Sequence, residues 1–318
     1  MSTEIKKHIP IKLTYTSFFR NGRVLGDLLK RPGFEWVTEA RHAKRGSDWL
    51  IHQSCNAAFT PFVADVVQQA LALIGQDVPV IGGSENCCGE IQYILGDTDL
   101  GDMAARKAQQ GFSILKPKTL ISICPDCDFI FSQKPIAKRT YNNANISSLV
   151  VEILPLLKPL MKPIHKRVVF HRHSFTEFAR QDASNLKIIL EAIPGIVILD
   201  TKLSEGPGLH CQTTKPMPPE DQLAMFKEAK RLKADALVVP YHSCYRQHCK
   251  MQLSHGVETV HYVALLGESL GLKVHEEFKL LRMLNDVDVV AERLIARLPE
   301  NKISHDDMRA IVTRSIFC

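Results

Sequence analysis

Short apolar runs alternate with amphipathic segments over most of the chain, an order typical of α/β proteins. Residues 49–51 form the first apolar run, and in residues 60–75 apolar side chains recur at steps of three and four, which predicts a helix after a strand. Residues 78–81 predict a second strand, 99–112 a second helix and 119–123 a buried third strand. Strands that alternate with helices in this way predict a parallel sheet joined by right-handed crossovers.

The same order of elements occurs twice, which indicates an internal repeat. Residues 168–178 align with 50–62, and residues 236–244 align with 119–127. A stretch punctuated by prolines, from residue 155 to residue 163, lies between the two copies. The sequence therefore predicts two related α/β halves, each built on a small parallel sheet.

We expect three parts in the chain. Residues 1–48 precede the repeat as an N-terminal extension, 49–158 form the first domain, and 159–318 form the second domain with the C-terminal helices. The extension mixes aromatic and leucine side chains with basic ones, and two interpretations stay open: a packed cover of the first domain, or a docking element for a partner subunit. Helical spacing in residues 286–297 and 306–316 predicts helices that pack onto the rest.

Composition and charge exclude several classes of protein. With 45% apolar and 23% charged residues, the chain is globular rather than disordered or fibrous. Its net charge of +6 is spread without a dense basic block, so a nucleic-acid partner is not expected. No apolar h-region follows the N-terminal charges, and no apolar run approaches the roughly 18 residues of a membrane span. We expect a soluble, cytoplasmic protein without a transmembrane segment.

Nine cysteines change this picture. Their number is odd, their spacing is clustered and no export signal is present, so reduced, metal-binding thiols are expected rather than disulfides. The first five fall within one short region, as Cys55, the pair Cys87-Cys88 followed by Gly89, and a Cys-x2-Cys formed by Cys124 and Cys127.

The spacing of these five cysteines favours one shared inorganic centre. The two residues between Cys124 and Cys127 let both sulfurs face one point. Cys87 and Cys88 can serve one site only where the chain turns sharply, as Gly89 permits. Each cysteine group follows a predicted strand, and sites of open α/β sheets lie beyond the carboxyl ends of the strands. Five thiolates exceed the ligands of one tetrahedral zinc, so an iron–sulfur cluster fits the count better, with a structural zinc as the alternative.

The pattern Cys-x31-Cys-Cys-Gly with a downstream Cys-x2-Cys resembles the CCG domain found in the B-type subunit of heterodisulfide reductase. That domain also occurs in iron–sulfur subunits of glycolate and lactate oxidases and in some fumarate reductases. In the family it occurs in tandem, each copy is a small Rossmann-like α/β fold, and the five cysteines of one copy hold a non-cubane 4Fe-4S cluster at which a disulfide is cleaved or formed. The resemblance implies this ligand role for Cys55, Cys87, Cys88, Cys124 and Cys127, in a chain of two pseudo-symmetric Rossmann-like CCG domains plus the N-terminal extension.

In the second copy, the five cysteine positions correspond to Ser174, His210, Cys211, Tyr241 and Cys244. Only two thiols remain, so one cluster and a degenerate second domain are expected. His210, Cys211 and Cys244 are candidates for a second site, in which zinc is the metal that Cys and His would bind. The alternatives are a degenerate site of hydrogen-bonded histidines and buried thiols, or a substrate channel in which Cys211 or Cys244 is reactive.

Three histidines are candidate proton donors, because histidine titrates near neutral pH: His52, His171 and His173. The glycine-rich stretches lack the spacing of a dinucleotide fingerprint, so NAD or FAD binding by this chain is not expected.

The resemblance implies an oxidoreductase: an iron–sulfur subunit of a heterodisulfide-reductase-like complex that performs or supports thiol/disulfide chemistry. Within that family, the chain resembles the second B-type subunit of the sulfur-oxidising bacterial complexes. The implied partners are other iron–sulfur and flavoprotein subunits, and the implied substrate is a thiol or disulfide such as a protein-bound lipoyl group. Two alternatives stay open: a non-catalytic electron-relay or assembly subunit, like those of glycolate and lactate oxidases, and a zinc-binding structural protein.

Overall fold

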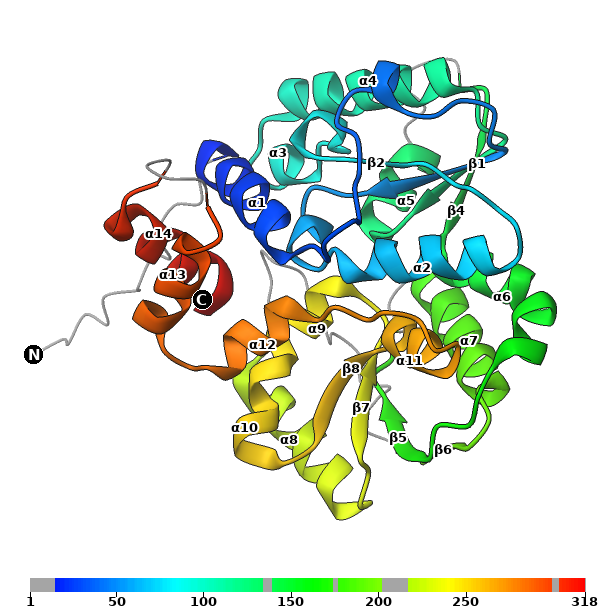
Figure 1. Cartoon of the computed structure of the whole chain (residues 1–318), viewed down its shortest axis with the longest axis vertical. Coiled ribbons are helices and arrows are strands. Elements are labelled where there is room, and N and C mark those ends of the chain that lie inside the picture. Colours follow the sequence, from blue (N-terminus) through cyan, green and yellow to red (C-terminus); the bar gives the residue numbers. More distant parts are fainter. Residues whose placement is uncertain (1–14, 134–138, 174–176, 202–216, 299–302, 318) are drawn as a thin grey trace, which may run out of the picture.

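Two four-stranded sheets form the framework of the molecule. The computed structural model describes residues 15–133, 139–173, 177–201, 217–298 and 303–317. Every strand pair in both sheets is parallel. Figure 1 shows the first-half sheet above the second-half sheet, with helices around and between them. The predicted α/β fold with two small parallel sheets is confirmed.

The first sheet has the strand order β2-β1-β3-β4. Its strands are β1 (Trp49–Gln53), β2 (Val80–Gly82), β3 (Thr119–Ser122) and β4 (Asn142–Asn145), and the helices between them are α2 (Phe62–Leu73), α3 (Glu90–Ile94), α4 (Thr98–Leu115) and α5 (Pro125–Gln133). Leu50, Ile51 and Leu120 are almost fully buried. The central strands β1 and β3 are buried along nearly their whole length because helices cover both faces of a parallel sheet.

The second sheet repeats this arrangement with the order β6-β5-β7-β8. Its strands are β5 (Lys166–Phe170), β6 (Ile196–Ile198), β7 (Ala236–Val239) and β8 (Glu258–His261), and the helices between and after them are α7 (Glu177–Ala192), α8 (Pro219–Arg231), α9 (His242–His248), α10 (Gln252–His255) and α11 (Tyr262–Ser269). In each half the first strand has the second strand on one side and the third on the other. Both sheets therefore bring the carboxyl ends of their first and third strands side by side.

The two halves pack through helices. The connecting helix α6 (Ile146–Leu157) continues through Pro155 and packs against α7, while α2 of the first half packs against α11 of the second. The approach of α2 and α11 is close: a Cβ atom at Gly267 would lie 2.8 Å from a methyl group of Val66. Glycine at this point lets the two helices touch.

The two ends of the described chain pack together, at the left of Figure 1. The helices involved are α1 (Tyr15–Leu29), α12 (Glu277–Met283), α13 (Val287–Ile295) and α14 (His305–Val312). The Asn21 amide donates a hydrogen bond of 3.0 Å to Ser315 Oγ, and the Arg297 guanidinium donates one of 3.2 Å to the Leu28 carbonyl. Leu25 and Leu29 are fully buried. The described part of the extension is thus packed, and its role in docking a partner stays a prediction.

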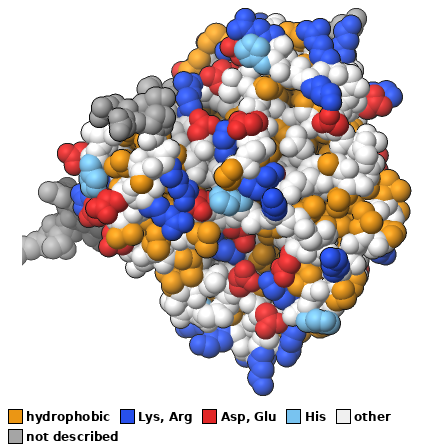
Figure 2. Space-filling model, in the orientation of Figure 1, with side chains coloured by type: hydrophobic (Ala, Val, Ile, Leu, Met, Phe, Trp, Pro, Cys, Tyr) orange, Lys and Arg blue, Asp and Glu red, His pale blue; other side chains and the backbone are white. Residues whose placement is uncertain are grey.

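Basic and acidic side chains are interspersed on the face shown in Figure 2, with hydrophobic side chains scattered between them. Among the described helices, none has both the length and the apolarity that a bilayer crossing requires.

Candidate metal centre

The five first-half cysteines lie at the carboxyl edge of the first sheet, as expected from their positions after strands. Cys55 follows β1, Cys87 and Cys88 follow β2 after the short turn Ser84–Asn86, and Cys124 follows β3. Cys127 lies in the first turn of α5. Because β1 is paired with both β2 and β3, no long loop is needed to bring these thiols together.

The five sulfurs form a row of contacts. Cys55 Sγ lies 3.6 Å from Cys87 Sγ, and Cys127 Sγ lies 3.2 Å from Cys88 Sγ. Cys87 also interacts with its neighbour Cys88, and Cys124 interacts with Cys127 at the other end. All five are buried free thiols. A row of five donors has the extent of a multi-iron group rather than of one mononuclear ion.

Gly89 provides the sharp turn that lets the adjacent residues Cys87 and Cys88 serve one site. Its φ of 88° lies in the left-handed region, and its N–H points to Cys87 Sγ at 3.4 Å. A Cβ atom at this position would lie 2.3 Å from the Gly101 carbonyl oxygen of α4. The turn and the close approach of α4 both exclude a side chain, which explains the glycine after the cysteine pair.

Cys87 is the one cysteine of this row whose pKa is lowered, whereas the pKa values of the other four are raised. Hydrogen bonds from the thiols of Cys55 and Cys88 and from the Gly89 N–H lower the pKa of Cys87 well below its ordinary value. The same contact with Cys87, together with burial, raises the pKa of Cys55. The pKa of Cys127 is raised by its contacts with Cys124 and Cys88 and by burial.

This donor set fits an iron–sulfur cluster. The site offers several buried thiols, and the N–H of Gly89 supplies a hydrogen bond of the kind that tunes sulfur ligands. Cys55, Cys88, Cys124 and Cys127 line a hollow of about 20 Å³, so the thiolates would move apart to admit an inorganic core.

Two acidic residues that sequence reasoning did not single out lie beside the sulfurs. Glu90 and Asp126 line the same hollow and are hydrogen-bonded to each other. Burial and the Asp126 carboxylate raise the pKa of Glu90 to about 9, so Glu90 is protonated at neutral pH. The only signal in the sequence is adjacency, since Glu90 follows Cys-Cys-Gly and Asp126 lies inside Cys-x2-Cys.

The second half completes the wall of the cysteine hollow. His242 and Ser243, at the start of α9, line it together with the cysteines. Burial and the nearby Arg246 lower the pKa of His242 to about 3, so its ring is neutral. This placement depends on how the halves pack, which the repeat alone did not indicate.

Cys55 is also open to a larger cavity of about 330 Å³. With 9% of its surface exposed, Cys55 is the most accessible of the five cysteines. Helix α1 and the segment after it supply much of the wall, including Phe19, Lys30 and Trp36. The N-terminal extension therefore shapes the approach to the first cysteine.

His52, a predicted proton donor, lies inside the first half. Its ring packs against Phe112 and Phe131, with ring centroids 5.2 and 5.4 Å apart, and its Nε2 lies 2.8 Å from the Asn86 carbonyl oxygen. Burial lowers the pKa of His52 to about 4. These contacts suit a residue that supports the turn before Cys87, and a proton-donating role stays a prediction.

His171 and His173 lie with Cys244 at the carboxyl edge of the second sheet. The metal-binding atoms of these three residues are all within 4.8 Å of one another. Burial and the neighbouring His173 and His248 lower the pKa of His171 well below its ordinary value. The other two candidates for the second site, His210 and Cys211, lie outside the described residues.

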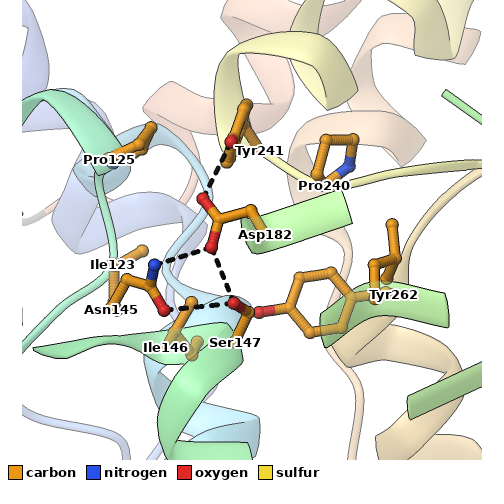
Figure 3. Close-up of a pocket in the computed structure, with 10 residues that line it drawn as sticks. Ile123, Pro125, Asn145, Ile146, Ser147, Asp182, Pro240, Tyr241 and Tyr262 are labelled. Atoms are coloured by element: carbon orange, nitrogen blue, oxygen red, sulfur yellow. Dashed lines mark hydrogen bonds between the residues drawn. The ribbon is translucent and has the colours of Figure 1, made fainter. Parts of the chain in front are cut away.

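A buried polar network lies between the halves beside this group. Figure 3 shows Asp182 of α7 facing Tyr241, Asn145 and Ser147. Its carboxylate accepts hydrogen bonds from the Tyr241 hydroxyl at 2.8 Å, the Asn145 amide at 2.6 Å and the Ser147 hydroxyl at 2.7 Å. The network ties the β4–α6 junction of the first half to the segment before α9.

The fold and the cysteine centre together define a cysteine-rich α/β protein with a redox or metal-binding site. Residues 49–132 match the family model of the CCG cysteine-rich domain. The first half of the chain therefore contains a CCG domain, and this domain indicates an iron–sulfur or metal-binding role. No curated protein matches the sequence.

Two solved structures share a weak likeness with the chain. One is a proposed Asp/Glu racemase from Yersinia pestis, with a TM-score of 0.35 and 9% identity over 70% of this chain and 96% of the other. The second is a sugar ABC transporter from Actinomyces odontolyticus, with a TM-score of 0.24 and 12% identity over 77% of this chain and 81% of the other. TM-scores this low say nothing about function.

Proposed function

We propose that the chain is an iron–sulfur subunit of a heterodisulfide-reductase-like complex, in which Cys55, Cys87, Cys88, Cys124 and Cys127 hold one non-cubane 4Fe-4S cluster. The observation that carries the proposal is the row of five buried free thiols at the carboxyl edge of a CCG-domain sheet. When bound, such a cluster would supply electrons to, or accept them from, a substrate sulfur.

The reaction class is the interconversion of a disulfide and two thiols. Cleavage of one S–S bond consumes two electrons and two protons and yields two thiols, and the reverse reaction releases them. We assign the electrons to a partner iron–sulfur or flavoprotein subunit, and the substrate to a thiol or disulfide such as a protein-bound lipoyl group. Within this proposal the chain acts as a second B-type subunit of a sulfur-oxidising complex in the cytoplasm.

The cavity beside Cys55 supports a substrate role for this edge of the site. Its volume of about 330 Å³ lies in the range of small-molecule sites. The rings of Phe19 and Trp36 offer apolar surface to a carbon chain, and Cys55 is the one of the five cysteines that lines this cavity. We assign the substrate approach to this cavity.

Metal analysis after anaerobic purification tests the cluster. We expect about four irons and four sulfides per chain, as a 4Fe-4S cluster requires. Cys87→Ser should lose most of the iron, because Cys87 contacts both Cys55 and Cys88. Cys249→Ser is the matched control: Cys249 is a buried thiol of the second half that contacts the Arg246 carbonyl, and iron should be retained. Zinc without iron in the wild-type chain would refute the cluster.

Electron paramagnetic resonance distinguishes substrate chemistry from electron relay. The spectrum of the oxidised, anaerobic chain is recorded with and without a dithiol such as dihydrolipoamide. A new signal that depends on the dithiol supports direct chemistry at the cysteine centre. A spectrum that the dithiol leaves unchanged would favour the relay subunit instead.

A further inference from the structure

Three metal-binding side chains converge in the second half. His171 directly follows β5, His173 is two residues further on, and Cys244 lies in the first turn of α9 after β7. Because β5 and β7 are neighbours in a parallel sheet, their carboxyl ends deliver these residues to the same edge. All three are buried, with 0–3% of their surfaces exposed.

The geometry of the group suits one metal ion. His173 Nε2 lies 3.1 Å from Cys244 Sγ, and the rings of His171 and His173 have centroids 4.4 Å apart. The three metal-binding atoms lie within 4.8 Å of one another. Donors around one tetrahedral zinc lie about 3.5 Å apart, given Zn–N and Zn–S distances near 2.1 and 2.3 Å. The three separations are therefore at most about 1.3 Å longer than in a zinc site.

We propose that His171, His173 and Cys244 bind one divalent metal ion, and that this ion is zinc. Two imidazoles and one thiolate form a mixed nitrogen and sulfur ligand set. Such a set binds zinc in preference to magnesium or calcium, which take oxygen ligands. Three protein donors leave the fourth tetrahedral position for a small ligand. This inference is independent of the cluster proposed for the first half.

Residues around the three proposed ligands fix the orientation of His173, as neighbouring residues do in established metal sites. The Tyr241 ring stacks on the His173 ring with centroids 5.2 Å apart and an interplanar angle of 28°. The Tyr241 hydroxyl in turn donates to Asp182, which is anchored by Asn145 and Ser147 (Figure 3). His173 is thereby fixed through a buried network that spans both halves.

Tyr241 also accounts for part of the difference in metal-binding side chains between the two halves. Tyr241 occupies the position of Cys124 in the internal repeat, so an aromatic ring stands where the first half has a thiol. A phenol is an unusual ligand for an iron–sulfur cluster, whose iron is held by thiolates and in some cases by imidazoles. The described second-half donors therefore suit a single ion.

Metal content and cobalt spectroscopy test the site on the chain with its iron in place. We expect about one zinc per chain in addition to iron. His173→Gln and Cys244→Ser should each lose the zinc and keep the iron, with far-ultraviolet circular dichroism showing that both variants fold. His165→Gln, which changes an exposed histidine of the same half, should keep both metals.

Cobalt(II) added after zinc removal should produce a thiolate-to-cobalt charge-transfer band in the near ultraviolet, seen as a difference spectrum against the same chain without cobalt. The band should be absent in Cys244→Ser and present in His165→Gln. Retention of the band in Cys244→Ser would overturn the proposal. So would a wild-type chain that gives no band, a result that does not depend on any variant. Iron loss in Cys87→Ser reports separately on the first-half cluster.

Discussion

Gly89 is constrained in two ways that can be separated by mutation. Its positive φ disfavours any residue with a side chain, and the Gly101 carbonyl oxygen would lie 2.3 Å from an added Cβ atom. Gly96 has a similar φ of 85° but nothing within 4 Å of the same atom. Replacing either glycine by alanine therefore strains the backbone to a similar degree, but only the substitution at Gly89 adds a steric clash.

Gly89→Ala should lower the free energy of unfolding by about 2–4 kcal/mol, through backbone strain plus displacement of α4. Gly96→Ala, the control, should cost only about 1–2 kcal/mol, the price of the left-handed conformation. Urea unfolding followed by circular dichroism measures both. Equal losses for the two variants would show that contact with α4 is unimportant.

At the scale of elements, the strands and helices with regular apolar spacing were predictable, whereas β4, whose sequence is Asn-Asn-Ala-Asn, was not. The buried runs of β1 and β3 and the helical spacing of α2 appear directly in the sequence. The repeat predicted a second sheet, which has the same strand order. The contact of α2 with α11 was not predictable, since Gly267 in α11 has no local feature that identifies Val66 as its neighbour.

Gly267→Ala tests this helix crossing. The added methyl group would lie 2.8 Å from Val66 and Val274, so we expect a loss of about 1–3 kcal/mol in the free energy of unfolding. Gly111, inside α4, is the matched control because its nearest neighbours would lie 3.8 Å or more from the new atom. Gly111→Ala should stabilise by up to about 1 kcal/mol, since alanine favours helix. Thermal unfolding compares the two, and a stabilised Gly267→Ala would contradict the close packing.

At the scale of the whole molecule, the candidate site depends on contacts that no single segment encodes. The cysteines were predictable because their spacing and their positions after strands are local features. Their acidic neighbours and the wall formed by His242 were not, because burial and the packing of the halves create them. Likewise, the pairing of His171 and His173 with Cys244 required the second sheet to bring β5 and β7 together.

Charge pairs across the second half add a pH-dependent contribution to stability. Glu258 at the start of β8 faces Lys166 of β5 at 3.1 Å and Lys279 of α12 at 3.1 Å, and these lysines also face Glu268 and Glu276. Burial opposes ionisation of Glu258, but the two ammonium groups outweigh it and lower the pKa of Glu258. Burial likewise opposes the charge on Lys279, and the carboxylates outweigh it and raise its pKa.

The sign of this contribution follows from the lowered pKa of Glu258. Stabilisation is fully present above the unfolded pKa of about 4.5 and is lost as the pH falls through the folded value. Glu258→Gln should therefore cost about 1–2 kcal/mol at pH 7 and have less effect at pH 3.5. Glu152→Gln, on the exposed side of α6, is the control and should change little. Urea unfolding between pH 3.5 and 7 gives the comparison, and a cost that does not vary with pH would contradict the ion pairs.

The first turn of α9 has a consequence for communication across the molecule. Ser243 lines the thiol hollow of one half, and the next residue, Cys244, belongs to the imidazole group of the other. Consecutive Cα atoms are only about 3.8 Å apart, so the same turn of helix contributes a residue to each of the two groups. We therefore expect a change of charge or ligation on one side of this turn to shift the position of the residue on the other side.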